Sequence, residues 1–423
     1  MSSMTEKKKY AVSSFFAGIG GFDIAFERNG FTTRFLCEIN PFCQSVLSQH
    51  WPNVKKSSDI NEIQSSDIPH SDVWCGGFPC QDISLARGAS KRLGLNGSRS
   101  GLFYRYAELI AEEKPEVVII ENVAGLFNSN KGRDFGVIIQ TMTSLGYAVS
   151  WRLLNSRYFG VPQSRTRVYL CCWLNNPTKA IRVLFDKCGA EKPKRERLDF
   201  ITEASKPNEY PKVPNVSYCL AASSGRHTGT DWSRTYVVCH DGVRRMTPLE
   251  SERLQGFPDK WTELQKFNGN DDDLNTLRYT AIGNAVSIPV VEWIAKRVYS
   301  ELSASEQSEW DWQHIQTSYK DFKKGELHDN LNDMDFTDVD QNHKWQKGGI
   351  AWNGLYMDCL VSPTPSTIIK SSLLDLIEKD GVSSIYYLSP NAAEGILRRV
   401  DNQGRTLFSP LRIALEKLKD KNE

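Results

Sequence analysis

Short apolar runs alternate with amphipathic stretches over residues 10–172, and this alternation restricts the fold more than any other feature. The runs have the length of buried strands, and the stretches between them repeat at helical spacing. Strands that alternate with helices form a largely parallel, doubly wound sheet. We therefore expect an α/β fold, with strands at 11–16, 33–37, 73–75, 117–120, 147–154 and 168–173, and helices at 22–29, 42–50, 102–112 and 135–145.

The character of the sequence changes after residue 174, and the changes suggest domain boundaries. A polar, Pro- and Lys-containing stretch with weak periodicity is typical of an irregular insertion. Residues 303–348 are polar, acidic and poor in branched apolar side chains, as in a linker. The expected division is a catalytic domain at 1–174 completed by 281–302, a loop-rich inserted domain at 175–280, an acidic linker at 303–348 and a small C-terminal module at 349–423.

Composition excludes little. Lys and Arg total 52 and Asp and Glu total 51, so the net charge neither indicates nor excludes a nucleic-acid partner. A basic stretch at 187–197 and an acidic one at 321–340 can cancel in that sum. The ten cysteines form no CxxC pair and no zinc-type spacing with histidine, so we expect no metal site. The lack of a disulfide-like pattern, a signal peptide and a membrane-length apolar run predicts a cytoplasmic protein.

Two predicted strands are followed by reactive side chains. Cys80 comes directly after Pro79 in a Gly-Gly-Phe-Pro-Cys-Gln loop, where a nucleophile stands clear of the backbone. Glu121 comes directly after the apolar run 117–120, at the end of a predicted strand. Open α/β sheets assemble their sites at such strand ends. A thiolate and a carboxylic acid together suit nucleophilic attack on an electron-poor heterocycle whose ring nitrogen is protonated. The alternative for Cys80 is a small buried hydrophobe.

A glycine-rich turn and two acids form a candidate nucleoside site. Residues 16–22 read Phe-Ala-Gly-Ile-Gly-Gly-Phe between the first strand and the first helix, where glycines let the backbone approach a ligand. Glu38 ends the second strand, where an acid can bind a ribose diol. Asp59 follows the third strand-like element and can accept from an adenine amino group. Each acid alone is more often a cap or a loop residue, but three features at successive strand ends favour a cofactor.

With these motifs in this order, the chain resembles the DNA (cytosine-5) methyltransferases of bacteria and phages. The resemblance covers residues 10–302 and includes Gln-x-Arg-x-Arg at 163–167, the Thr-Pro-containing segment 245–258 and Ile-Gly-Asn-Ala-Val at 282–286. It implies a Rossmann-like S-adenosyl-L-methionine-dependent sheet and a target-recognition domain in the insertion. It also implies methylation at C5 of a cytosine that is flipped out of duplex DNA. Ser14 stands where the family usually has an acid before the glycine loop.

The resemblance assigns roles to individual residues. Cys80 is expected to add to C6 of cytosine, Glu121 to bond N3 and Arg165 to face the base, with Arg167 in a more structural role. The glycine-containing basic loop 84–100 resembles a lid that closes over DNA. Contacts with S-adenosyl-L-methionine are expected from Phe16, Gly18, Gly20, Gly21, Glu38, Asp59, Ile60, Leu102 and Asn284. Contacts with DNA are expected from Gln81, Ser84, Arg87, Arg92, Arg99, Gln163 and Arg167.

The expected partner is double-stranded DNA, bound by a monomer without membrane association. A cognate restriction endonuclease acting separately fits a restriction-modification role, and self-protection of a phage is the other setting. The main alternative is an RNA (tRNA) cytosine-5 methyltransferase, although the Cys-Phe-Thr segment of that branch is missing. A non-enzymatic relative would not need Cys80, Glu121 and the glycine loop, and a dinucleotide-dependent oxidoreductase would leave Cys80 without a task. The recognition sequence and the role of the C-terminal module stay open.

Overall fold

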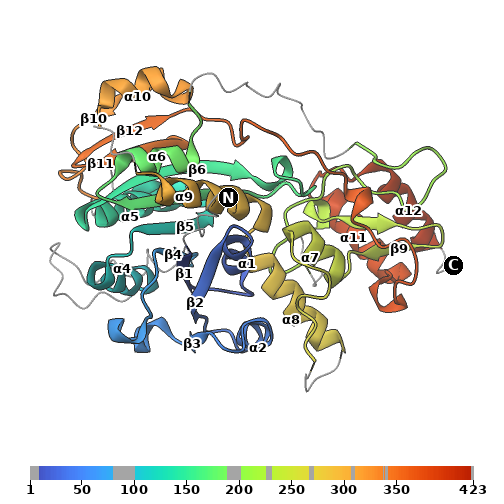
Figure 1. Cartoon of the computed structure of the whole chain (residues 1–423). Coiled ribbons are helices and arrows are strands. Elements are labelled where there is room, and N and C mark those ends of the chain that lie inside the picture. The colour runs from blue at the N-terminus through green and yellow to red at the C-terminus, as the bar shows by residue number, and fades with distance from the viewer. Residues whose placement is uncertain are drawn as a thin grey trace, which may run out of the picture. The chain divides into compact units, whose positions relative to one another are not determined.

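The structure is a computed structural model, and it describes residues 9–79, 101–187, 202–224, 231–265, 271–305, 310–336, 338 and 342–420 (Figure 1). The chain divides into two compact units. The first, here called the sheet unit, comprises Met1–Leu154, Thr166–Lys192 and Val290–Ser366. The second, the hairpin unit, comprises Asn155–Arg165, Pro193–Pro289 and Thr367–Glu423.

A ten-stranded mixed sheet forms the centre of the sheet unit, in the order β10-β12-β11-β6-β7-β5-β4-β1-β2-β3. The strands at one end of this order are parallel to one another, whereas β7 pairs antiparallel with β5. The α/β class is therefore confirmed, with one half of the sheet mixed rather than parallel. The bounds are β1 (Tyr10–Phe15), β2 (Phe31–Cys37), β3 (Lys55–Ser57), β4 (Val73–Gly76), β5 (Val117–Val123), β6 (Tyr147–Asn155) and β7 (Thr166–Leu174).

The strand order reverses direction at β1. From β1 the chain adds β2 and β3 on one side and then crosses to β4 and β5 on the other. Connections that leave neighbouring parallel strands in opposite directions open a crevice at the carboxyl ends of those strands, where ligands bind in open α/β sheets. The segments that leave β1 and β4 are the glycine-rich loop and the loop that leads to Cys80.

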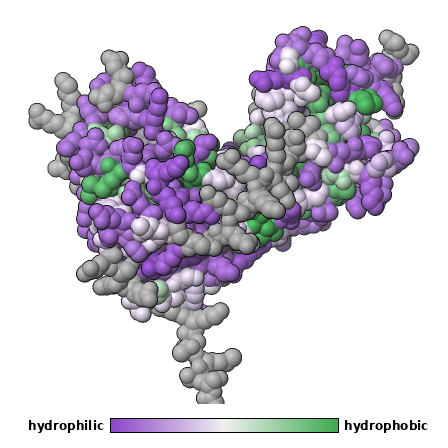
Figure 2. Space-filling view, turned by 90° about the horizontal axis from the view of Figure 1, so that it is seen from above, coloured by the Kyte–Doolittle hydropathy of each residue, from purple (hydrophilic) through white to green (hydrophobic). Residues whose placement is uncertain are grey.

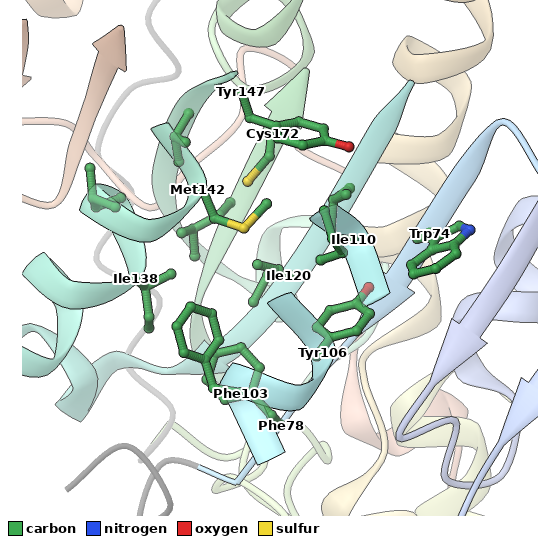
Figure 3. Packing of buried hydrophobic residues seen from close by; sticks show 14 of the residues in the cluster. Trp74, Phe78, Phe103, Tyr106, Ile110, Ile120, Ile138, Met142, Tyr147 and Cys172 are labelled. Carbon is green, nitrogen blue, oxygen red and sulfur yellow. The ribbon is translucent and has the colours of Figure 1, made fainter. Parts of the chain in front are cut away.

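Helices cover the sheet and bury a core rich in aromatic side chains (Figure 3). Phe15 packs against Trp74 and Tyr106 with ring centroids 4.5 and 4.9 Å apart, and Phe78 packs against Phe103 at 4.9 Å. These contacts fix the ends of β1 and β4 against α4, so both site loops leave from a rigid base. The helices of this unit are α1 (Gly21–Glu27), α2 (Pro41–His50), α4 (Leu102–Glu113), α5 (Arg133–Ser144), α6 (Pro177–Leu184), most of α9 (Ile288–Ser303) and α10 (Trp312–Ser318).

The expected acidic linker at 303–348 is wrong, because this segment and the strands after it belong to the sheet unit. β11 (Gly348–Trp352) pairs antiparallel with β6, and β12 (Leu355–Cys359) and β10 (Leu327–His328) follow at the edge. Phe322 and Leu331 are fully buried. The acidic surface residues lowered the average hydropathy and concealed these few core positions. The expected C-terminal module is divided as well, since only 367–423 belongs to the hairpin unit.

The hairpin unit is built around the antiparallel pair β8 (Tyr236–Val238) and β9 (Val243–Arg245). Helix α7 (Pro248–Gln255) begins with a capping box between Thr247 and Glu250 and ends at Gly256 in the left-handed region, at φ +85. The guanidinium of Arg244 donates to both oxygens of Glu250, and both side chains are buried. The other helices of the unit are α8 (Asp271–Asn284), α11 (Pro390–Asn402) and α12 (Ser409–Lys419).

Hydrophilic residues cover most of the face displayed in Figure 2. Large apolar side chains that are exposed include Ile39, Leu360 and Ile413. Within the described ranges, none of the helices combines the length and the apolar character needed to cross a membrane.

Candidate active site

The glycine-rich loop between β1 and α1 has three residues with positive φ. Phe16, Gly18 and Gly20 adopt φ values of +55, +58 and +82. A side chain at Gly20 would collide with the ring of Trp51, at 2.3 Å, so packing alone requires this glycine. At Gly18 no atom lies within 4 Å of the position a Cβ would take. The loop is thus packed on one side and open at Gly18, and the strained conformation of Phe16 is of the kind found at ligand sites.

Glu38 fastens the glycine loop to the end of β2. The backbone N–H of Gly18 donates to its Oε2 at 2.7 Å, and that of Asn40 donates to its Oε1 at 2.8 Å. Asn40 in turn caps α2 by accepting from the N–H of Cys43 at 3.1 Å. The carboxylate therefore holds a fixed position beside the loop, at the strand end where the sequence placed it.

The segment after β3 is tied to the first turn of α4. Asp59 accepts from the backbone and side-chain amides of Asn61, both at 2.9 Å and both through Oδ1. The next residue, Ile60, is buried, and its carbonyl accepts from Arg105 of α4 at 3.4 Å. Leu102, which begins α4, packs half-buried against the same core cluster as Ile60. The structure thus ties Asp59, Ile60 and Leu102 into one part of the sheet unit.

Glu121 lies beside the loop that leads to Cys80. A methyl group at Gly77 would stand 3.5 Å from Oε2 of Glu121, which is van der Waals contact. Asn122 adds a second link, because its side-chain amide donates to the carbonyl of Phe78 at 3.1 Å. The ring of Phe78 also contacts Phe16, with centroids 6.5 Å apart. The two strand-end motifs and the glycine loop therefore meet at one edge of the sheet.

Arg167 is the positive partner of Glu121. Its Nε lies 3.2 Å from Oε1 of Glu121, and both side chains are largely buried. The antiparallel register of β5 and β7 places Val123 opposite Arg167, so Glu121 is its diagonal neighbour. The carboxylate thus directs one oxygen to Arg167 and the other to the Gly77 side.

Arg165 and Gln163 have a different environment, inside the hairpin unit. Arg165 is 2% exposed and donates to the backbone carbonyls of Leu220, Gly283 and Ala285 at 3.0, 3.0 and 2.8 Å. Gln163 is fully buried and donates to the carbonyl of Leu254 at 2.9 Å. These contacts do not fit the expected roles of Arg165 at the base and Gln163 on DNA. Both side chains brace the chain, because burial and internal partners occupy their polar groups.

The brace formed by Arg165 holds the turn that contains Asn284. Gln255 of α7 strengthens it by donating to the carbonyls of Ile282 and Ala285 at 2.9 and 3.1 Å. Asn284 itself is exposed at the end of α8. Six of the expected site residues lie outside the described residues: Cys80, Gln81, Ser84, Arg87, Arg92 and Arg99, together with the rest of the expected lid.

One acid at the glycine loop escaped the sequence analysis. Asp23, in the first turn of α1, is fully buried and accepts from the hydroxyl of Ser14 at 2.7 Å. This bond joins the two ends of the loop, since Ser14 precedes it and Asp23 follows it. Burial raises the pKa of Asp23 to about 7, and the nearby Glu27 adds to the rise. The sequence offered one signal for Asp23. It is an acid that closely follows the glycines, in a chain that has Ser14 where the family usually has an acid.

The described cysteines are mostly poor candidates for a nucleophile. Six of the eight are buried: Cys37, Cys43, Cys75, Cys171, Cys172 and Cys359. Burial raises the pKa of all six, to about 12 for Cys37 and Cys43. Because the thiolate is the nucleophilic form, these thiols are held in the unreactive state.

Known proteins resemble this chain over most of its length. The family model for C-5 cytosine-specific DNA methylases matches residues 10–217 and 202–300. A Type II methyltransferase of Bacillus subtilis, M2.BsuMI, is 33% identical over 310 residues, which is 68% of this chain and 75% of that protein. The Type II methyltransferase M.HaeII of Haemophilus aegyptius is 33% identical over 341 residues, or 74% of this chain and 100% of that protein.

A solved structure shares the fold. The S. pombe Dnmt2 methyltransferase aligns with a TM-score of 0.50 and 17% identity, over 70% of this chain and 100% of that chain. The family match and the identity to the bacterial relatives define the class, which is the cytosine-methylating enzymes of DNA. The chain belongs to the C-5 cytosine-specific DNA methylase family.

Proposed function

We propose that the chain transfers a methyl group from S-adenosyl-L-methionine to C5 of a cytosine within a specific sequence of duplex DNA, using Cys80, Glu121 and Arg167. The observation that carries the proposal is the position of Glu121, which has Arg167 on one side and the Gly77 to Pro79 segment before Cys80 on the other. Family membership already makes DNA cytosine the substrate. The cofactor contacts, the roles of the residues and the setting of the enzyme are the parts proposed.

The strand ends of the sheet unit fit S-adenosyl-L-methionine. The open space at Gly18 lets a ligand approach the backbone, and the fixed carboxylate of Glu38 suits a ribose diol. Asp59 uses Oδ1 for Asn61, and Oδ2 suits the adenine amino group. Phe16, Ile60 and Leu102 supply apolar contacts, while Gly20 and Gly21 shape the loop. Asn284 is the last of the proposed cofactor contacts. When bound, the cofactor supplies a methyl group on a sulfonium centre.

The chemistry of the chain's own residues starts at Cys80. Its thiolate adds to C6 of the cytosine, and the electron pair of the C5–C6 bond becomes available at C5, which accepts the methyl group. Glu121 bonds N3 and stabilises the enamine that this addition creates. The proton on C5 then passes to solvent water, the electron pair of that C–H bond restores the C5–C6 double bond, and the C6–S bond breaks to release Cys80 as the thiolate. Addition and elimination balance, so the enzyme returns to its starting state with 5-methylcytosine as product.

Arg167 takes the role at the base that the sequence analysis gave to Arg165. Its ion pair holds Oε1 of Glu121 and leaves Oε2 directed to the side of the Cys80 loop. A guanidinium at this place also favours negative charge on the reacting groups. Arg165 instead holds the turn that contains Asn284.

The target carbon is inaccessible in a stacked duplex, so the cytosine must leave the helix before it reacts. The basic loop 84–100 is the proposed lid over DNA, with phosphate contacts from Arg87, Arg92 and Arg99. Methylation of RNA is the less supported alternative, because the matched family model describes a DNA methylase. A cytoplasmic monomer acting in restriction-modification or self-protection is the proposed setting.

Covalent trapping tests the proposal. Duplex DNA with 5-fluorocytosine at the target should form a stable adduct in the presence of S-adenosyl-L-methionine, because fluorine cannot leave as a cation. Peptide mapping should locate the adduct on the peptide that contains Cys80, and Cys80→Ser should abolish it. Cys219→Ser is the matched control, since that thiol is among the less buried ones of the described chain. An adduct on another cysteine, or normal turnover by Cys80→Ala, would contradict the mechanism.

A further inference from the structure

The C-terminal segment 367–420 lies outside the family match, which ends at residue 300. In the structure it is the smaller of the two main parts of the hairpin unit, and the larger part is the insertion, residues 193–289. Figure 1 shows α11 and α12 beside β9 and α7, although more than a hundred residues separate the two pairs in sequence. The segment therefore lies against the insertion, within the same compact unit.

The core of the hairpin unit is shared between the two segments. Tyr236, Val238 and Val243 of the β8–β9 pair pack into one buried cluster with side chains from α11 and α12. The C-terminal side contributes the larger number of buried residues, namely Leu388, Ala393, Ile396, Leu397, Val400, Leu407, Phe408, Leu411 and Leu415. A two-stranded hairpin is at best marginally stable alone, so the insertion depends on the C-terminal helices for a core.

Buried polar contacts join the same segments. The backbone of Glu378 accepts from Arg244 at 2.9 Å and donates to Glu250 at 2.8 Å, so it completes their buried ion pair. Arg399 donates to Asp231 at 2.8 Å, and Asp231 is 1% exposed. Breaking a contact of this kind leaves a buried charge without its partner, which is costly in free energy. These contacts therefore favour one arrangement of the two segments over others.

Two arginines of the C-terminal segment hold the start of the described stretch 231–265. Arg399 bonds Asp231, and the guanidinium of Arg405 lies 4.4 Å from the ring centre of Trp232. Arg398, Asn402 and Thr406, which are close to these arginines in sequence, are exposed and have the side-chain types that contact phosphates and base edges. The segment thus holds the insertion and also carries exposed polar side chains.

We propose that residues 367–420 form the second half of the DNA target-recognition unit, and that Arg399 and Arg405 are positioning residues for target choice. This inference rests on the proposed function. Target choice therefore depends on two parts of the chain that are distant in sequence. If the insertion alone were transferred to a relative, the insertion would lack the C-terminal side chains that complete its core.

The test compares two arginines of the same segment. The target is first identified by bisulfite sequencing of DNA from a methylation-free host that expresses the unchanged chain. The methylation rate at this target is then compared with the rate at sites that differ by one base pair. Arg399→Ala should lower this ratio about tenfold, while the affinity for S-adenosyl-L-methionine, measured by calorimetry, stays unchanged. Arg412→Ala is the control, because Arg412 pairs with Asp401 and Glu416 within the C-terminal segment, and it should leave the ratio unchanged.

Arg399→Lys keeps the charge and should restore part of the ratio, and Arg405→Ala should lower it as an independent variant that removes no buried ion pair. Unchanged ratios in both Arg399→Ala and Arg405→Ala would overturn the inference. So would an equal fall in Arg412→Ala, which would indicate a general loss of stability. Failure of the unchanged chain to methylate DNA would contradict the proposed function instead.

Discussion

The two units of the chain are constructed in different ways. In the sheet unit, each candidate cofactor residue follows its own strand, and the partners of Glu38 are within about twenty residues of it in sequence. In the hairpin unit, Arg165 is bonded to carbonyls 55, 118 and 120 residues away. Local patterns therefore describe the strand-end residues of the first unit well, whereas the Arg165 contacts of the second unit are long-range in sequence.

The pair Arg165 and Arg167 shows what this difference means for function. Only Thr166 separates them in sequence, yet one is enclosed by the backbone of the hairpin unit and the other faces Glu121 in the sheet unit. The same residue type therefore braces the backbone in one unit and pairs with the proposed catalytic acid in the other. The predictions below test this separation, beginning with the largest effect.

Replacement of Glu121 by Gln should lower kcat by roughly 10²–10⁴-fold, because the amide keeps the shape but cannot act as the acid. DNA binding in a gel-shift assay should change little. Glu116→Gln provides the control, since Glu116 is partly exposed and lies 3.9 Å from Lys179 of the same unit. A Glu121→Gln enzyme with normal kcat would remove Glu121 from the chemistry.

Arg165→Ala and Arg167→Ala should separate stability from catalysis. Loss of Arg165 deprives buried carbonyls of their donor and should lower the free energy of unfolding by roughly 2–4 kcal/mol. Loss of Arg167 should lower kcat of the folded enzyme by about 10–100-fold, whereas loss of Arg165 should lower it far less. Equal effects of the two variants on both quantities would contradict the division between the units.

The extent of prediction from sequence follows the same division. The glycine loop, Glu38, Asp59 and Glu121 could be placed because period-two and period-3.6 patterns mark strand ends, and parallel strands bring those ends together. Spacing could not decide between Arg165 and Arg167, because their partners are far away in sequence. The pairing of β11 with β6 was missed for the same reason, since it joins residues about two hundred positions apart.

Glu38→Ala and Asp59→Ala should each weaken the binding of S-adenosyl-L-methionine by roughly 1.5–3 kcal/mol, the value of a hydrogen bond to a charged group. Glu38→Ala should have an added effect on the glycine loop, because the N–H of Gly18 loses its acceptor. Calorimetry on the folded variants measures both changes. The outcome that would count against the site is an unchanged affinity in both, and Asp67→Ala, an exposed acid of the same unit, is the comparison.

Asp23→Asn should remove a pH dependence that belongs to the sheet unit alone. Burial raises the pKa of Asp23 from 3.8 to about 7 in the folded chain, so the folded state keeps a proton that the unfolded state releases. Stability from this group is fully present below about pH 4 and is lost as the pH rises toward 7, with a slope of up to about 1.4 kcal/mol per pH unit. Urea unfolding at several pH values between 4.5 and 8 measures the free energy of unfolding of the unchanged chain and of Asp23→Asn. In the difference between the two free energies, the contributions of the other titrating groups cancel. The amide mimics the protonated acid, so the variant should match the unchanged chain at low pH and should gain stability relative to it as the pH rises toward 7. A difference that does not vary with pH would show that the carboxyl is ionised in the folded state, and that the Ser14 hydroxyl holds the loop through a charged partner.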